Sequence, residues 1–182
     1  MRLGFSAASL CGLAAAGLLL GASASWKFVQ RNPGGAEPPA SAADAAAAEL
    51  VDAHIRALQP GHLTDVASTD QNTVKPWFDG RTAFSPPVPD LAAQDFPLVG
   101  ARLDVFQGRA VAALVYGRRK HLISVFLWPD VTRDTEQYAG MMNGYRWISW
   151  KHSGLRFCAV GDTNRDDLAA LKALIQPLAW CV

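Results

Sequence analysis

The sequence predicts an α+β domain, an antiparallel sheet of about five strands with one helix before it and one after it. Two observations lead to this prediction. Five β-rich runs lie in the second half of the chain, and short glycine-bearing breaks separate several of them, which is typical of a meander of hairpins. A run of strong helix formers precedes these strands, and an amphipathic run with acidic residues at its start follows them. We expect both helices to cover one face of the sheet.

The composition bounds the class of protein. The chain has 182 residues, which suits one globular domain with additional segments. Half of the residues are hydrophobic, 18% are charged, and the formal net charge is +1. A nucleic-acid-binding protein would show a basic excess, so we expect no direct nucleic-acid partner.

The first 26 residues predict a transmembrane anchor or a signal segment. Leu3–Trp26 carries no charge and is long enough to span a bilayer, which takes about 20 apolar residues. The sequence ASA at Ala22–Ala24 also resembles a signal-peptidase site. Both readings stay open, and both place the residues after Lys27 outside the cytoplasm. Residues 27–43 are rich in Pro, Gly and Ala and predict a flexible linker, and residues 44–182 predict the folded domain.

The folded part begins with a predicted helix over Ala45–Leu58. Its apolar positions recur at helical spacing, and Pro60–Gly61 stops it. The spaced residues are Leu50, Ala53, His54, Ala57 and Leu58.

The stretch DQNTVKPWFDG, residues 70–80, predicts a turn rather than a helix, because we see no clear helical period in it. Pro76 also excludes a central strand. We expect Trp77 and Phe78 to pack under the sheet while Lys75 stays in water. The alternative is that Lys75, Pro76, Trp77 and Phe78 form a contact for a partner or ligand. Three prolines at positions 86, 87 and 89 then predict a stiff, extended connector.

Five runs predict the strands. They are Leu98–Phe106, Arg109–Gly117, His121–Trp128, Gly144–Trp150 and Leu155–Gly161. Arg118, Arg119 and Lys120 make a basic hairpin tip, which either discourages edge pairing or contacts an acidic partner or lipid headgroups.

The last helix is predicted with Thr163 as its N-cap and an apolar stripe against the sheet. The stripe comprises Leu168, Leu171, Ala173, Leu174 and Ile175.

The cysteines predict no metal or redox motif, because no two of them are close in sequence. Cys158 and Cys181 are the candidate pair for a disulfide in an oxidising compartment. The alternative is that Cys158 is a small buried hydrophobe and Cys181 a residue of the chain end.

No catalytic motif is present, so we expect no enzyme, no cofactor and no metal. One alternative keeps an enzyme open, with His62, Asp65 and Asp70 as an acid–base or metal cluster. It requires these three side chains to converge in one pocket.

Several long motifs carry a family resemblance. They are TVKPWFDG, FSPPVPDL, FPLVGARLD, GRAVAALVY and RRKHLISVFLWP. Together they resemble the extracytoplasmic part of bacterial transmembrane anti-sigma factors, over roughly Glu49 to Ile175. Asn72 stands where the family pattern usually has a histidine, and Ala101 and Ala110 replace a Gly and a Pro.

The resemblance implies a transcription regulator of a stress response. Its C-terminal domain would act as a sensor in the periplasm, and a single pass would hold it in the bacterial inner membrane. It would control a sigma factor of the extracytoplasmic-function type. Members of the family bind this sigma factor through a cytoplasmic domain, often with a zinc motif, whereas only Met1 and Arg2 precede the apolar run here. We therefore expect sigma-factor contact only if an upstream cytoplasmic domain exists. The alternative function is a secreted or anchored periplasmic module that binds a small molecule or a protein partner.

Overall fold

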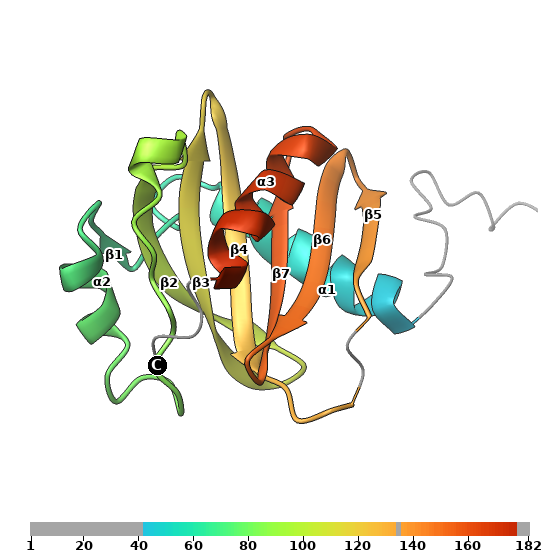
Figure 1. Ribbon diagram of the computed structural model, residues 1–182, viewed down its shortest axis with the longest axis horizontal. Helices are drawn as coiled ribbons and strands as arrows, with labels where there is room; N and C mark the ends of the chain where they lie inside the picture. Colours follow the sequence, from blue (N-terminus) through green and yellow to red (C-terminus); the bar gives the residue numbers. More distant parts are fainter. Residues whose placement is uncertain (1–41, 134–135, 178–182) are drawn as a thin grey trace, which may run out of the picture. The chain divides into compact units, whose positions relative to one another are not determined.

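The computed structural model describes residues 42–133 and 136–177, in which one seven-stranded antiparallel sheet carries helices on both faces (Figure 1). The strands are β1 (Val66–Ala67), β2 (Leu98–Phe106), β3 (Arg109–Arg118), β4 (His121–Pro129), β5 (Tyr138–Met142), β6 (Tyr145–His152) and β7 (Leu155–Gly161). The helices are α1 (Ala42–Ala57), α2 (Gln71–Trp77) and α3 (Arg165–Ile175), with one 3-10 turn, η1 (Ala92–Gln94). The predicted α+β class with a helix on either side of the strands is confirmed.

The strand order is β1-β2-β3-β4-β7-β6-β5, which differs from the predicted simple meander. After β4 the chain runs to the far edge of the sheet, forms β5, and returns inward through β6 and β7. As a result β4 pairs with β7, for example Phe126 with Cys158. The crossing is possible because the segment after β4 is long enough to reach the opposite edge.

Two edge strands were not predicted from the sequence. β1 has only two residues, and a β-bulge at Leu98–Gly100 lies opposite it. β5 contains Gly140 and no β-branched residue, so it lacks the usual strand composition. Both strands form because a longer neighbouring strand supplies backbone hydrogen-bond partners. The residues of β1 and β5 do not by themselves reveal that such a neighbour is present.

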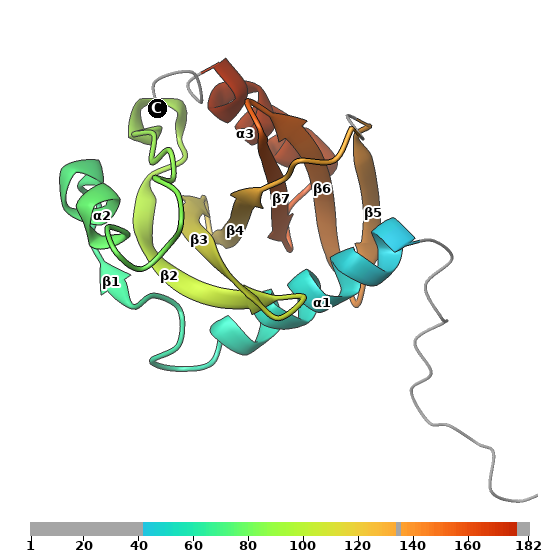
Figure 2. The ribbon, with the colours of Figure 1, turned by 90° about the horizontal axis from the view of Figure 1, so that it is seen from below.

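Each face of the sheet has its own apolar core, because successive residues of a strand point to opposite faces. α3 packs on one face, where Leu168, Leu171 and Ile175 are buried. α1 packs on the other face, where Leu50 and Val51 are buried. Figure 2 shows the two helices on opposite sides of the curved sheet. The prediction that both helices cover one face is therefore wrong. The central strands are apolar on both sides for this reason.

The stretch that opens with Asp70 is a short helix, α2, and not the predicted turn. The Asp70 carboxylate caps it by accepting a hydrogen bond from the backbone N–H of Asn72 at 2.8 Å. Val74 and Phe78, four residues apart, are both buried in the core shared with α3. This i, i+4 pair is the helical signal that the presence of Pro76 obscured. Pro76 cannot donate to the carbonyl of Asn72, and the helix ends one residue later.

α3 begins one residue later than predicted. Asn164 is its N-cap, and its side-chain oxygen accepts a hydrogen bond from the N–H of Asp167 at 2.7 Å. Thr163, the predicted cap, instead donates its hydroxyl to the Asp167 carboxylate at 3.0 Å. Ala173, which was placed in the apolar stripe, is exposed.

None of the helices in the described residues is both long enough and apolar enough to cross a membrane. The predicted anchor or signal segment, Leu3–Trp26, lies outside the described residues, as does most of the predicted linker.

Candidate functional site

A hollow of about 410 Å³ lies between the first half of α1 and the sheet. α1 contributes one wall through three small residues, Ala43, Ala46 and Ala47, and through Leu50, all at helical spacing. Alanine has no side chain beyond Cβ, so the helix leaves space above the strands. The remaining walls are Ala42, Phe106, Gln107, Arg109, Trp128, Asp130, Thr132, Tyr138, Trp147, Ser149, Arg156 and Cys158.

The register of the sheet assembles the floor of this hollow from four strands. Cys158 of β7 pairs with Ser149 of β6, and Ser149 pairs with Tyr138 of β5. One row further along the strands, Trp128 of β4 pairs with Arg156 of β7. Directly paired residues of antiparallel strands point to the same face. Side chains that are distant in sequence therefore line one surface.

Four aromatic side chains line the hollow, those of Phe106, Trp128, Tyr138 and Trp147. The rings of Phe106 and Trp128 lie 4.6 Å apart between centroids and are tilted by 47°. Trp147 is buried, and its ring lies against Gly140, where an added Cβ would come within 2.8 Å of the indole nitrogen. An aromatic, mostly apolar hollow with a few polar groups is the usual form of a small-molecule site.

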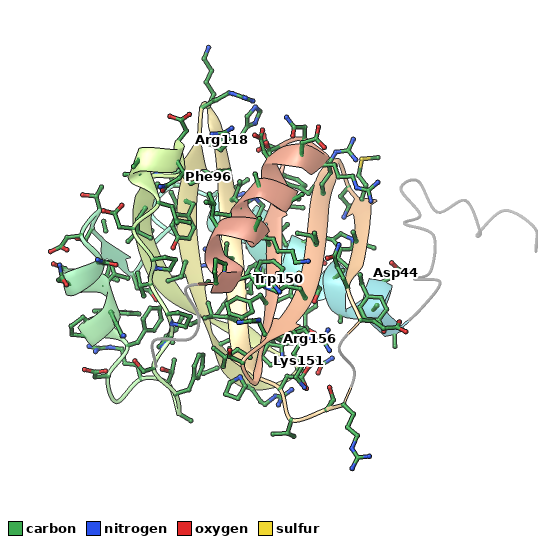
Figure 3. The ribbon with its side chains drawn as sticks, viewed as in Figure 1. Asp44, Phe96, Arg118, Trp150, Lys151 and Arg156 are labelled. Atoms are coloured by element: carbon green, nitrogen blue, oxygen red, sulfur yellow. The ribbon has the colours of Figure 1, made fainter. Side chains whose placement is uncertain are left out.

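One end of the hollow is charged. Arg156 Nε donates to Asp130 Oδ2 at 2.9 Å, and Lys151 Nζ lies 3.8 Å from Asp130 Oδ1. All three side chains are at most 12% exposed. Burial alone would raise the pKa of Asp130, but hydrogen bonds from Thr132 and the Arg156 guanidinium outweigh it and hold the pKa at about 2. Figure 3 shows Arg156 and Lys151 at the same end of the sheet.

Cys158 lies buried at the base of the hollow and forms no disulfide with any described residue. Burial raises its pKa to about 12, so the reactive thiolate is scarce at neutral pH. Its predicted disulfide partner, Cys181, lies outside the described residues, and the pairing stays a prediction.

A second, more polar hollow of about 480 Å³ opens beyond the other half of α1. His62 and Asp65 line it together with Arg102 and Asp104. Asp70 does not line it, because its carboxylate caps α2. Asp65 Oδ2 is engaged with the backbone N–H of Leu103 at 2.9 Å. The three side chains therefore do not converge in one pocket, as the enzyme alternative requires.

A buried polar network lies next to this second hollow and links α1 to the sheet. Arg102 Nη1 donates to Ser124 Oγ at 3.3 Å, and Ser124 Oγ lies 2.9 Å from His54 Nδ1. A guanidinium can only donate, so the serine hydroxyl accepts from Arg102, and it forms a second hydrogen bond with the imidazole. His54 Nε2 has no hydrogen-bond partner within the described residues.

The environment keeps His54 neutral. Burial is the main cause that lowers its pKa, from 6.5 to about 4, and the nearby Arg102 charge lowers it further against an opposing effect of Asp162. The Tyr145 ring packs edge to face with the imidazole of His54, and the two ring centroids lie 5.2 Å apart. Ser124, whose hydroxyl stands in the middle of this network, is fully buried, so the network serves as a structural connection between α1 and the sheet.

The predicted contact residues of α2 lie away from both hollows. Phe78 is 1% exposed, as expected for a core residue, whereas Trp77 is only partly buried. The two rings meet edge to face at 5.2 Å, and the Arg81 guanidinium lies 4.9 Å from the Trp77 ring centre. Lys75 and Pro76 line neither hollow.

The basic hairpin tip is tied to α3 rather than freely solvated. Arg118 Nε binds Asp167 Oδ1 at 2.8 Å, and Arg119 Nη1 binds Asp167 Oδ2 at 3.2 Å. The Arg118 guanidinium also lies 4.5 Å from the Phe96 ring centre, at the end of the sheet opposite Arg156 (Figure 3). These interactions favour a structural role for Arg118, while the side chain of Arg119 remains 63% exposed.

Among the described residues, no three His, Cys, Asp or Glu side chains are grouped closely enough to hold a metal ion. Comparisons of this chain with protein-family models, with curated proteins and with solved structures found no match.

Sequence reasoning missed the hollow under α1. The sequence pattern explains its aromatic residues as ordinary strand residues and the alanines of α1 as ordinary helix formers. A usable signal was present nonetheless, because Ala43, Ala46 and Ala47 fall on the same helix face as the apolar Leu50.

Proposed function

We propose that the described domain is the extracytoplasmic sensor of a membrane-anchored regulator similar to the transmembrane anti-sigma factors. One observation supports this most directly. The first half of α1 forms a wall of the hollow and is also the first described element after the linker and the apolar segment. A molecule in the hollow would thus contact the helix that leads back toward the predicted anchor.

This arrangement offers a route for signalling. Ligand contacts on Ala43 or Ala46 change the free energy of packing α1 on the sheet. A ligand shifts a conformational equilibrium only by its differential affinity for the two states. Ligand binding would therefore change how firmly the start of α1, at Ala42, packs on the sheet. The sigma factor itself would be bound on the cytoplasmic side of the inner membrane, as the family resemblance implies.

The second candidate function is a periplasmic binding module without sigma-factor contact. The same hollow favours it, because an aromatic pocket with a charged end is sufficient for ligand binding alone.

The orientation of the full chain tests both candidates. The chain with a C-terminal epitope is produced in a Gram-negative bacterium, and spheroplasts are treated with protease. We expect the chain to sediment with membranes and resist alkaline carbonate, and we expect its epitope to be digested in intact spheroplasts. An epitope that is protected until the cells are lysed would place the domain in the cytoplasm and overturn both candidates.

Transcription separates the two candidates. In the source bacterium, the gene is replaced by an Ala46→Leu variant that fills the hollow, and the transcriptome is compared with that of an Ala45→Leu control. We expect genes under one extracytoplasmic-function sigma factor to change in the first strain only. Identical transcriptomes in the presence of the stimulus would favour the simple binding module.

A further inference from the structure

We propose that the hollow under α1 binds an amphipathic carboxylate, with its apolar body between α1 and the aromatic walls and its carboxylate toward Arg109 and Arg156. The inference names the ligand class for the sensor site and in that sense rests on the proposed function. Its test, however, measures binding alone.

The size of the hollow sets the size of the ligand. A volume of about 410 Å³ corresponds to roughly 14 water-sized volumes of ~30 Å³ each. A ligand with about a dozen non-hydrogen atoms fills it, such as a medium-chain fatty acid. The volume also lies within the ordinary range for small-molecule pockets, about 300–1,000 Å³.

The lining sets the character of the ligand body. Four aromatic side chains and five residues of α1 surround the space. Phe106 and Trp147 are at most 3% exposed, so the walls are held in place by the core rather than by solvent-facing rotamers. Their rings and the alanine methyl groups offer almost no hydrogen bonds. An apolar chain or ring gains free energy here, whereas a polar body would lose its hydration.

The charges set the character of the ligand head. Of the charged described residues that line the hollow, Arg109 and Arg156 are cationic and Asp130 is anionic. Lys151 and Arg156 both lie against Asp130, and the backbone N–H of Gln107 binds the Glu49 carboxylate. The described lining residues carry one cation more than anions, and the exposed Arg109 is the cation at the rim that a ligand carboxylate would pair with. A cationic head would meet like charge instead.

The second hollow, beside Arg102, suits an amphipathic anion less well. The hollow beside Arg102 is lined by Arg56 and Arg102 together with Asp65 and Asp104, so its carboxylates balance its guanidinium groups. Its apolar lining is also sparse, since Leu103 and two alanines are its hydrophobic residues. An amphipathic anion is therefore expected under the first half of α1 and not there.

Photo-crosslinking tests the proposal on the full chain. The protein is placed in phosphatidylcholine nanodiscs and exposed to a diazirine analogue of dodecanoate, and labelled peptides are mapped by mass spectrometry. We expect label on peptides from the first half of α1 and from β4, β6 and β7. Excess dodecanoate should remove about 90% of it, a tenfold effect, whereas dodecyltrimethylammonium of equal chain length should remove little.

Matched variants make the test specific. Ala46→Leu places three more non-hydrogen atoms in the hollow and should lower labelling about tenfold. Ala45→Leu, on the exposed side of the same helix turn, should leave it unchanged. Arg109→Gln removes a rim charge without touching the core and should weaken competition by dodecanoate about fivefold. Circular dichroism spectra of all variants should match that of the parent chain.

Two results would overturn the proposal. Label that is competed equally by the anionic and the cationic detergent would mean partition into any apolar surface. Label that is unaffected by Ala46→Leu would mean that the probe binds elsewhere. Neither result depends on membrane orientation or transcription, so the ligand assignment and the proposed function can fail separately.

Discussion

Acidification from pH 7 to pH 5 should destabilise the domain mainly through His54. The folded state holds the pKa of this buried imidazole at about 4, whereas the ordinary value is 6.5. The unfolded chain therefore binds a proton more tightly than the folded one, and stability falls as the pH drops from 6.5 toward 4. This contribution is fully present above pH 6.5. The linkage relation gives a loss of about 2 kcal/mol at pH 5 and about 3 kcal/mol at pH 4.

Other acidic groups act in a lower window. The pKa values of Asp130 and Asp167 are depressed below 3.8, because hydrogen bonds and arginine neighbours outweigh burial. Their stabilisation is present above pH 3.8 and is lost as the pH falls through their folded pKa values. The range between pH 5 and pH 7 therefore isolates the His54 contribution from theirs.

The assay is urea unfolding of a fragment of residues 37–182, followed by circular dichroism at pH 5 and pH 7. His54→Asn is the control, because an amide retains a hydrogen-bonding group for Ser124 but does not titrate. We expect the parent to lose about 2 kcal/mol more than the variant between the two pH values. Equal losses in the two proteins would refute the assignment of a buried neutral imidazole.

Four further predictions concern packing and charge. Phe78→Ala should lower the free energy of unfolding by about 3–5 kcal/mol, because the ring is 1% exposed. Trp77→Ala should lower it clearly less. Urea unfolding measures both variants, and equal losses would contradict the packing described. Gly100→Ala should destabilise the domain by more than about 1 kcal/mol, because the added Cβ would lie 2.3 Å from the backbone oxygen of Val66, and a variant as stable as the parent would contradict this close approach. Asp167→Asn should cost about 3 kcal/mol, since it leaves Arg118 without its buried partner at 2.8 Å, and Arg118→Met should partly restore the loss in the double variant. Cys158 should resist iodoacetamide in the folded protein and react in urea, because its thiol is buried with a pKa of about 12, and rapid labelling of the native protein would exclude this placement.

The sequence by itself determined the local elements of this protein. The five long strands were predicted within two residues of their ends, because each has its own β-rich composition and most have glycine-bearing turns beside them. In β6, Trp147 belongs to one core and Ile148 and Trp150 to the other, as the alternation of side chains along a strand requires. The periodicity of α1 and α3 was sufficient to predict both helices.

The tertiary structure decided everything that depends on partners distant in sequence. The pairing of β4 with β7 places Trp128 beside Arg156, and no local pattern contains that information. No local pattern fixes the packing of α1 and α3 on opposite faces, because a strand that is apolar on both sides fits either arrangement. The hollow exists because small α1 side chains face large aromatic side chains across that packing, which is a property of the assembled layers and not of any one segment.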